Sequence, residues 1–302
     1  MPTHRPAPFP PRDLAAAALV ILIWATNFVA FKFGLRSFTP LQTGAARFLF
    51  AAFPLLFFVR PPTIGWRWVA GYGLLQGVGQ FGCVIFALKV GMTAALAPVV
   101  MQVQVFVTAL LGVALLGERL GRPLKIGLLL AAVGLGCFAL NALAVGGSDQ
   151  VTLAGILLTL LGASSWSASN IVVRKLQAAG AKYSVLSLVV WSSAVSAAVF
   201  LLLSALFEDP APWRQWANAS LASLASVAWL GWIGNVVSFW LWTSLLSRHP
   251  ASRVAPFSLG VPAFGIVAGI MLLGETVTTW QWVGSAFVMA ALRVVVRGAR
   301  RT

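Results

Sequence analysis

The 302-residue chain is 60% hydrophobic and only 9% charged, and its mean hydropathy is +0.91. A water-soluble domain carries about 25% charged residues, so this composition excludes cytosolic enzymes, secreted disulfide scaffolds and disordered chains. The net charge of +15 comes from 21 lysines and arginines spread along the sequence, a distribution typical of membrane loops that does not indicate nucleic-acid binding.

Apolar segments long enough to cross a bilayer recur from end to end, and we predict an all-α integral membrane protein with ten transmembrane helices. Each segment has about 17–25 residues, which suits a hydrocarbon core about 30 Å thick. The first is too long for the core of a signal peptide and lacks a clear cleavage site, so we expect it to remain in the mature protein. In chain order, the predicted spans are 14–35, 41–59, 68–88, 93–116, 124–145, 153–173, 184–206, 222–246, 254–273 and 280–296.

The positions of the basic residues predict that both termini face the cytoplasm. In this orientation, 16 of the 21 lysines and arginines lie on the cytoplasmic side and four lie outside, while Arg47 falls within the second span. Such an excess is what the positive-inside rule describes.

The two halves of the chain share short motifs at matching positions. Gly117-Glu118 follows the fourth predicted span, and Gly274-Glu275 follows the ninth. An Ala-Pro pair precedes each of these glutamates by a similar distance. Near the start of each half, the sequence from Trp24 to Asn27 has an echo from Trp166 to Asn170. The chain therefore reads as a duplicated five-helix unit.

Because five is an odd number of helices, the two units must have opposite orientations in the membrane. The loop after the fourth span is rich in basic residues, whereas its counterpart at 274–281 has none. We predict two inverted-topology repeats, residues 1–147 and 148–302. Inverted repeats are typical of secondary transporters, whose binding sites lie near the midplane between the halves.

These features together resemble the EamA-type family of the drug/metabolite transporter superfamily. The ten-span layout, the Trp24-x-x-Asn27 motif, Arg47 in the second span and the paired Gly-Glu elements carry the resemblance. It implies a carrier of a bacterial-type inner membrane that exports amino acids and related metabolites. The 13 tryptophans suggest the aromatic amino-acid exporters, although tryptophan also forms interfacial belts.

Polar side chains inside the spans predict the substrate site, because polar groups at membrane depth are costly unless they are paired or solvated. Gln76 and Gln80 share one face of the third helix, whereas Gln102 and Gln104 should not share a face of the fourth. Such side chains can instead form interhelical hydrogen bonds, worth about 0.6 kcal/mol on average. The predicted substrate-binding residues are Trp24, Asn27, Gln76, Gln80, Gln102, Trp166, Asn170, Asn235 and Ser258.

Tryptophans away from the span ends also suit an amphipathic ligand, because each has an apolar ring and one donor. Besides Trp24 and Trp166, this description covers Trp191, Trp240 and Trp242. Each can equally well serve packing or face lipid.

Prolines and charged residues complete the predicted set. Prolines remove backbone donors and leave carbonyls that can face a cavity, so the predicted hinge or gating residues are Pro98, Pro256 and Pro262. The predicted structural residues are Arg47, Glu118 and Glu275. Arg47 would neutralise helix-end carbonyls or an internal acid, with substrate contact as the alternative. Each glutamate follows a glycine that ends one helix and would lie at the positive end of the next, with proton coupling as the alternative.

No predicted span contains an acid or a histidine, so we expect no buried proton relay, no metal site, no cofactor and no enzymatic activity. A phosphate-binding loop is also absent from the sequence, which argues against ATP-driven transport. We predict a secondary carrier that exports small amphipathic metabolites, amino acids including aromatic ones above all, by alternating access. Its partners would be a small-molecule substrate and the lipid bilayer.

The residues leave other classes open. A carrier for a nucleobase, sugar or cationic drug is the nearest alternative, and a channel or a non-transporting membrane scaffold is the next. The sequence does not define the oligomeric state, and a monomer is compatible with it.

Overall fold

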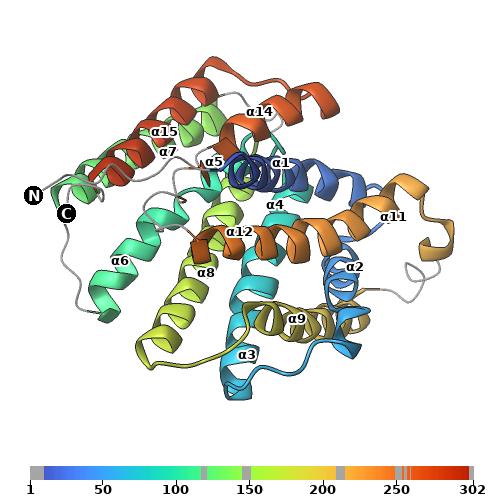
Figure 1. Cartoon of the computed structure of the whole chain (residues 1–302). Helices are drawn as coiled ribbons and strands as arrows, with labels where there is room; N and C mark the ends of the chain where they lie inside the picture. The colour runs from blue at the N-terminus through green and yellow to red at the C-terminus, as the bar shows by residue number, and fades with distance from the viewer. Residues whose placement is uncertain are drawn as a thin grey trace, which may run out of the picture.

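The computed structural model describes residues 10–116, 121–144, 151–208, 215–248, 254, 257, 258 and 260–298. Within these ranges the regular elements are all helical, and no strand is present (Figure 1). In chain order they are α1 (Pro11–Gly34), α2 (Pro40–Ala52), η1 (Leu55–Phe57), α3 (Trp66–Tyr72), η2 (Gly73–Gly82), α4 (Cys83–Val90), α5 (Ala97–Met101), α6 (Gln104–Leu116), α7 (Arg122–Ala144), α8 (Leu153–Ala178), α9 (Val185–Phe207), η3 (Gln215–Asn218), α11 (Leu221–Ala228), η4 (Trp229–Val237), α12 (Ser238–Arg248), α14 (Gly260–Leu273) and α15 (Thr279–Gly298).

Seven helical segments of the described chain are long and apolar enough to cross a membrane. Large apolar side chains also cover the outside: Leu129, Phe207 and Met271 are 70%, 77% and 77% exposed. Such a surface suits contact with lipid rather than water. The chain is therefore an all-helical membrane protein, as predicted. The number of ten spans stays a prediction, because α2 and α14 have only 13 and 14 residues and α15 is not among the seven.

The second predicted span, 41–59, is longer than the helix that forms there. α2 begins after a capping box, in which the Thr39 side chain accepts a hydrogen bond from the backbone N–H of Gln42 at 3.2 Å. It ends at Ala52 because Pro54 disfavours helical geometry in the residue before it, and Phe53 is extended, with φ −99° and ψ 139°.

The fourth predicted span, 93–116, is divided into α5 and α6. Between them the backbone hydrogen bonds connect residues three apart, from Gln102 N to Val99 O and from Val105 N to Gln102 O, each at 3.1 Å. Turns of this tighter kind change the directions in which successive side chains point.

The third and eighth predicted spans each have a π-helical middle section that the sequence did not lead us to expect. η2 joins α3 and α4 into one continuous helix, Trp66–Val90, and η4 joins α11 and α12. π-Helical turns are rare and occur frequently at functional sites.

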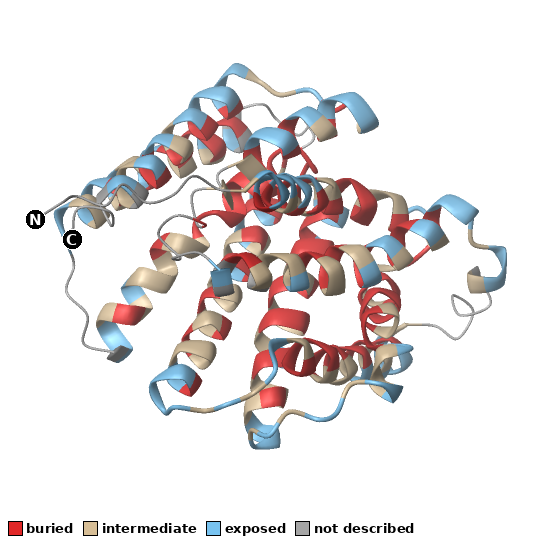
Figure 2. Cartoon of the chain, in the orientation of Figure 1, coloured by how far each residue is buried: buried red, intermediate tan, exposed pale blue. Residues whose placement is uncertain are grey.

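Helices from the two halves of the chain pack against one another. α7 lies along α15, α2 packs on α9, α1 on α14, and α6 on α8 (Figure 1). The pair α7 and α15 is antiparallel: a Cβ on Gly127 would lie 3.3 Å from Ala291 O, and a Cβ on Gly134 would lie 2.7 Å from Gly284 O. The largest buried cluster lies centrally, where α1, α4, α5 and α8 meet (Figure 2).

Candidate binding cavity

A cavity of about 310 Å³ lies between helices of both halves of the chain. Its wall includes residues of α1, η2, α4, α5, α6, α8, η4, α12 and α14. Seven of the nine predicted substrate-binding residues line it: Trp24, Asn27, Gln76, Gln80, Gln102, Trp166 and Ser258. The structure thus brings together side chains that are as far apart in sequence as Trp24 and Ser258.

Amides form the polar part of the cavity wall. Gln76 and Gln80 project from η2, and Asn27 projects from α1; all three side chains are buried. Gln80 Oε1 and Asn27 Oδ1 have no hydrogen-bond partner among the described residues. A buried acceptor without a partner carries an uncompensated desolvation cost, so each of these two oxygens would be stabilised by a donor that reached it.

Gln102 and Gln104 both line the cavity, and the expectation that they cannot share a face is wrong. The turn between α5 and α6 replaces the regular helix on which that expectation depended. Gln102 Nε2 also donates a hydrogen bond to Ser258 O at 3.4 Å, which connects the two halves at the cavity. The sequence reasoning did not include Gln104 in the site, because the break in the helix that brings Gln104 to the cavity is visible only in the structure.

Asn170 and Asn235 do not line the cavity. Asn170 Nδ2 donates to Gln104 Oε1 at 3.2 Å and to Thr108 Oγ1 at 3.4 Å. Asn235 Nδ2 donates to Ser193 Oγ at 3.1 Å, beside a separate void of about 10 Å³. Each asparagine is placed to hold its neighbours rather than to contact a molecule in the cavity.

Aromatic rings form much of the remaining wall. Trp24 donates from its indole nitrogen to Ser238 Oγ at 2.9 Å, and its ring centre lies 5.1 Å from that of Trp242. Trp242 and Trp166 line the cavity as well. By contrast, Trp191 donates to Val59 O at 3.0 Å, and Trp240 is largely exposed, so these two tryptophans lie outside the cavity wall.

Of the three predicted hinge prolines, only some lie where the sequence led us to expect them. Pro98 lines the cavity and packs against α14, since a Cβ on Gly265 would lie 2.4 Å from Pro98 Cγ. Pro262 is the third residue of α14. In the first turn of a helix the backbone N–H groups have no intrahelical acceptor, so a proline there breaks no hydrogen bond. We expected Pro262 to free a backbone carbonyl that could face the cavity, and at this position it does not. Pro256 lies outside the described residues.

Glu275 makes a contact that differs from the predicted one. Gly274 ends α14 with φ +65°, as expected of a glycine at this position. The Glu275 carboxylate, however, accepts hydrogen bonds from Ala94 N at 2.8 Å and Ala95 N at 2.7 Å. It therefore holds the start of the fourth span, and Thr278 caps the next helix instead. Glu118, its predicted counterpart, lies outside the described residues.

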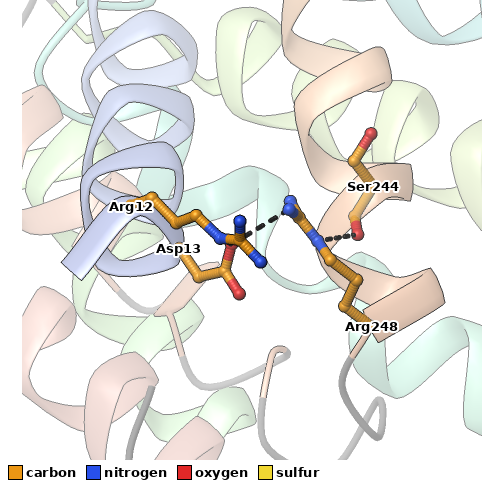
Figure 3. A network of polar contacts seen from close by, with 4 residues as sticks. All are labelled: Arg12, Asp13, Ser244 and Arg248. Atoms are coloured by element: carbon orange, nitrogen blue, oxygen red, sulfur yellow. Dashed lines mark hydrogen bonds and ion pairs between the residues drawn. The ribbon is translucent and has the colours of Figure 1, made fainter. Parts of the chain in front are cut away.

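Asp13 forms an ion pair that the sequence reasoning missed. It lies in the first turn of α1, is only 2% exposed, and is 3.2 Å from Arg248 at the end of α12 (Figure 3). Arg248 Nε donates to Ser244 O at 3.0 Å, and the more exposed Arg12 is 3.8 Å from the same carboxylate. The pair therefore joins the first helix to a helix of the second half.

Arg47 has neither of its expected structural partners. It is completely buried on α2, and none of its three guanidinium nitrogens has a hydrogen-bond partner in the described part of the chain. Its guanidinium instead lies 3.7 Å from the ring centre of Phe81. Over the same residues, no cluster of histidine, cysteine and acidic side chains that could hold a metal ion is found.

Two bacterial proteins are similar to the chain over almost its whole length. The chain is 37% identical to a Salmonella typhimurium (strain LT2) protein and 33% identical to an Escherichia coli (strain K12) protein, each over 290 residues and 96% of both sequences. Both are named "Probable amino-acid metabolite efflux pump". A solved structure with 20% sequence identity shares the fold, with a TM-score of 0.63 over 96% of this chain and 98% of that one.

The sequence model of the EamA-like transporter family matches the chain twice, at residues 13–140 and 153–297. Together the two matches cover most of the sequence, and they confirm the duplication and the resemblance read from the motifs. The chain belongs to the EamA-like transporter family.

Proposed function

We propose that this transporter is a secondary carrier that exports small amphipathic metabolites, above all amino acids including aromatic ones, by alternating access. Both bacterial relatives carry names that describe the efflux of amino-acid metabolites. Their similarity to this chain supports the direction and the substrate class of the proposal.

The composition of the cavity wall is the observation that carries the proposal. Amides and aromatic rings line it, and no acidic or basic side chain is among the described lining residues. A cationic drug would be expected to need an acidic partner, whereas a zwitterion has no net charge. The volume of about 310 Å³ lies at the lower end of the usual range for small-molecule sites, about 300–1,000 Å³, and suits one small metabolite.

The architecture we propose has ten spans in two inverted repeats, residues 1–147 and 148–302, with both termini in the cytoplasm of a bacterial-type cell. The double family match supports the repeats. The antiparallel packing of α7 on α15 supports their inversion, because these are the last helices of the two halves. In such folds the substrate site lies between the repeats, where the cavity is found.

Within this proposal, the seven lining residues predicted from the sequence contact the substrate. Pro98 and Pro256 allow α5 and the ninth span to change their angle during transport, while Pro262 lies in the first turn of α14 and marks where the rigid part of that span begins. Glu275 holds the helix ends together on one side of the cavity, through Ala94 and Ala95.

Counterflow in proteoliposomes tests the proposal. Vesicles containing the purified protein are loaded with unlabelled tryptophan, phenylalanine, threonine or no amino acid, and the uptake of labelled amino acid is followed with and without a pH gradient. We expect faster uptake only in loaded vesicles. We also expect no dependence on the pH gradient, because no described carboxylate lines the cavity.

Competition defines the substrate class in the same assay. Unlabelled nucleobases, sugars and cationic drugs should compete poorly with the labelled amino acid. The proposal is rejected if no amino acid gives counterflow, or if one of these other classes competes better than every amino acid.

A further inference from the structure

Arg47 is the one described residue that combines a full positive charge with complete burial. Its Nε, Nη1 and Nη2 atoms are all buried without a hydrogen-bond partner. The ion pairs found among the described residues lie elsewhere, around Asp13. A buried charge of this kind is strongly unfavourable unless something pairs with it, so its retention calls for a partner that arrives from outside the fold.

Three phenylalanine rings enclose the guanidinium. Its central carbon lies 3.7 Å from the ring centre of Phe81, 5.2 Å from that of Phe31 and 5.4 Å from that of Phe48. Cation–π contacts offset part of the lost hydration. They satisfy none of the five N–H donors of the guanidinium, whose planar fork matches a carboxylate.

Two of these rings separate Arg47 from the cavity. Phe31 and Phe81 both line the cavity, and their ring centres are 6.1 Å apart. Arg47 therefore lies directly behind the cavity wall, covered by one aromatic layer. Phe81 belongs to η2, a π-helical section of the kind that occurs frequently at functional sites. It is also the ring nearest to the guanidinium, so it covers Arg47 most closely.

The unpaired acceptors lie beside the same two rings along the chain. Gln80 precedes Phe81 directly, and Asn27 lies one helical turn before Phe31 on α1. Their side-chain oxygens, Oε1 and Oδ1, are buried without partners, so they would accept hydrogen bonds from an ammonium group once the wall opens. The unsatisfied groups around this wall are thus donors on Arg47 and acceptors on two amides, which is the complement of an α-amino acid.

We infer that Arg47 binds the carboxylate of the transported amino acid, and that Phe81 covers it until the substrate enters. In the covered state the aromatic ring shields the charge. When substrate enters, the ring moves aside and the carboxylate takes its place at the guanidinium, while Gln80 and Asn27 accept hydrogen bonds from the ammonium group. This inference rests on the proposed transport of amino acids.

Competition by phenylalanine and phenylalaninol against labelled phenylalanine in the counterflow assay tests the inference. Phenylalaninol keeps the ring and the amine but has an alcohol in place of the carboxylate. In the wild type, we expect phenylalanine to compete at a concentration about tenfold lower or more, as hydrogen bonds to a charged group allow. In Arg47→Gln and Arg47→Lys this preference should shrink, and competition by phenylalaninol should change by less than about twofold.

Two further variants separate binding from structure. Arg36 also lies over a phenylalanine ring, at 4.3 Å from Phe33, but it is exposed; Arg36→Gln should leave the preference unchanged. Phe81→Leu removes the cover and should improve competition by phenylalanine severalfold but not by phenylalaninol. This variant also provides a test if Arg47→Gln does not fold.

The outcomes distinguish the two proposals. If the wild type shows no amino-acid counterflow, the proposed function fails and the inference fails with it. If the wild type is active and the Arg47 variants keep its full preference for phenylalanine, only the inference is overturned. If Phe81→Leu weakens both competitors equally, Phe81 is part of the wall and not a cover.

Discussion

The π-helical sections η2 and η4 lie in the third and the eighth predicted spans, the third of each half, and they differ in what they contribute to the cavity. η2 presents Gln76 and Gln80 to the cavity. η4 reaches the cavity only through Gly234, and its polar residue Asn235 bonds to Ser193 instead. Of the two π-helical sections, only the one in the first half therefore contributes amide side chains to the cavity.

The two sections do share their mode of packing. A Cβ on Gly73 in η2 would lie 2.8 Å from Ser192 O on α9, and a Cβ on Gly231 in η4 would lie 2.6 Å from Arg47 O on α2. In each case a glycine brings one half against the backbone of the second helix of the other half. The comparison teaches that duplication has kept the packing, while the chemistry of the cavity has become asymmetric.

The largest expected effect comes from breaking that shared packing with Gly231→Ala or Gly73→Ala. Each new methyl group would meet a backbone carbonyl that cannot rotate away, and overpacking of this kind costs about 1–3 kcal/mol. A glycine-to-alanine change inside a helix otherwise stabilises by up to about 1 kcal/mol, so the sign itself is diagnostic. Thermal unfolding of the purified protein in detergent measures it.

Gly71→Ala is the matched control, because nothing lies within 4 Å of its Cβ position. It should be neutral or slightly stabilising. Equal stability of the Gly231, Gly73 and Gly71 variants would show that the close approach of the halves is not required for folding.

The next largest effect is expected at Glu275, where the halves meet away from the π-helical sections. Glu275→Gln replaces one of two accepting oxygens by an NH₂ group that faces a backbone N–H. A buried donor left unpaired costs about 1–3 kcal/mol, and the unfolding temperature should fall accordingly. Glu208→Gln is the control, since Glu208 is less buried and accepts one hydrogen bond, from Ser204 Oγ, that an amide oxygen can keep; the change should cost no more than about 0.5 kcal/mol. Equal effects of the two changes would mean that the Glu275 contact does not hold the start of the fourth span.

The chemical asymmetry of η2 and η4 is tested by comparing Gln80→Ala, Gln102→Ala and Asn235→Ala. The first two remove cavity amides, and a hydrogen bond of about 0.5–1.5 kcal/mol corresponds to a loss of about two- to tenfold in counterflow rate, with folding near normal. Asn235→Ala should lower stability by about 1 kcal/mol and leave transport per folded molecule unchanged. If both glutamine variants transport like the wild type, the cavity is not the substrate site.

Local pattern was sufficient for the parts of the cavity that depend on regular helix. The four-residue spacing of Gln76 and Gln80 places both in the wall, even though their helix is locally π-helical. The echo of Trp24 in Trp166 likewise identified two lining residues from two different halves. Gln76 and Gln80 both reach the wall because a shared face survives a small change in helical pitch.

The rest depends on contacts that no local pattern encodes. Nothing in the sequence around Gln102 signals the tight turn that brings Gln104 to the cavity. Glu275 lies 181 residues from Ala94, so its partner could not be inferred from the adjacent helix. Arg47 was expected to have a partner because buried charges usually do, and only the packed structure shows that its guanidinium has no hydrogen-bond partner among the described residues.

The smallest expected effect concerns the pair Asp13 and Arg248, which joins α1 to the helix that continues η4. Asp13→Asn alone would measure every contact of that carboxylate, so a double-mutant cycle with Arg248→Gln is needed to isolate the pair. Exposed pairs contribute about 0.2–1 kcal/mol. Because Asp13 is buried and Arg248 is 41% exposed, we expect a coupling near the upper end of that range, measured by thermal unfolding at low salt.

Two further measurements test the coupling between Asp13 and Arg248: its dependence on ionic strength and the effect of Arg12→Gln. The coupling should weaken as salt is added, because the exposed Arg248 end is screened. Arg12→Gln should change little, since its side chain is 75% exposed and 3.8 Å from Asp13. A coupling of zero would mean that α1 and α12 are held together at this end by apolar packing of Ala17 against Leu245. The ion pair would then add nothing to a contact between the halves that the glycines of η2 and η4 already secure elsewhere.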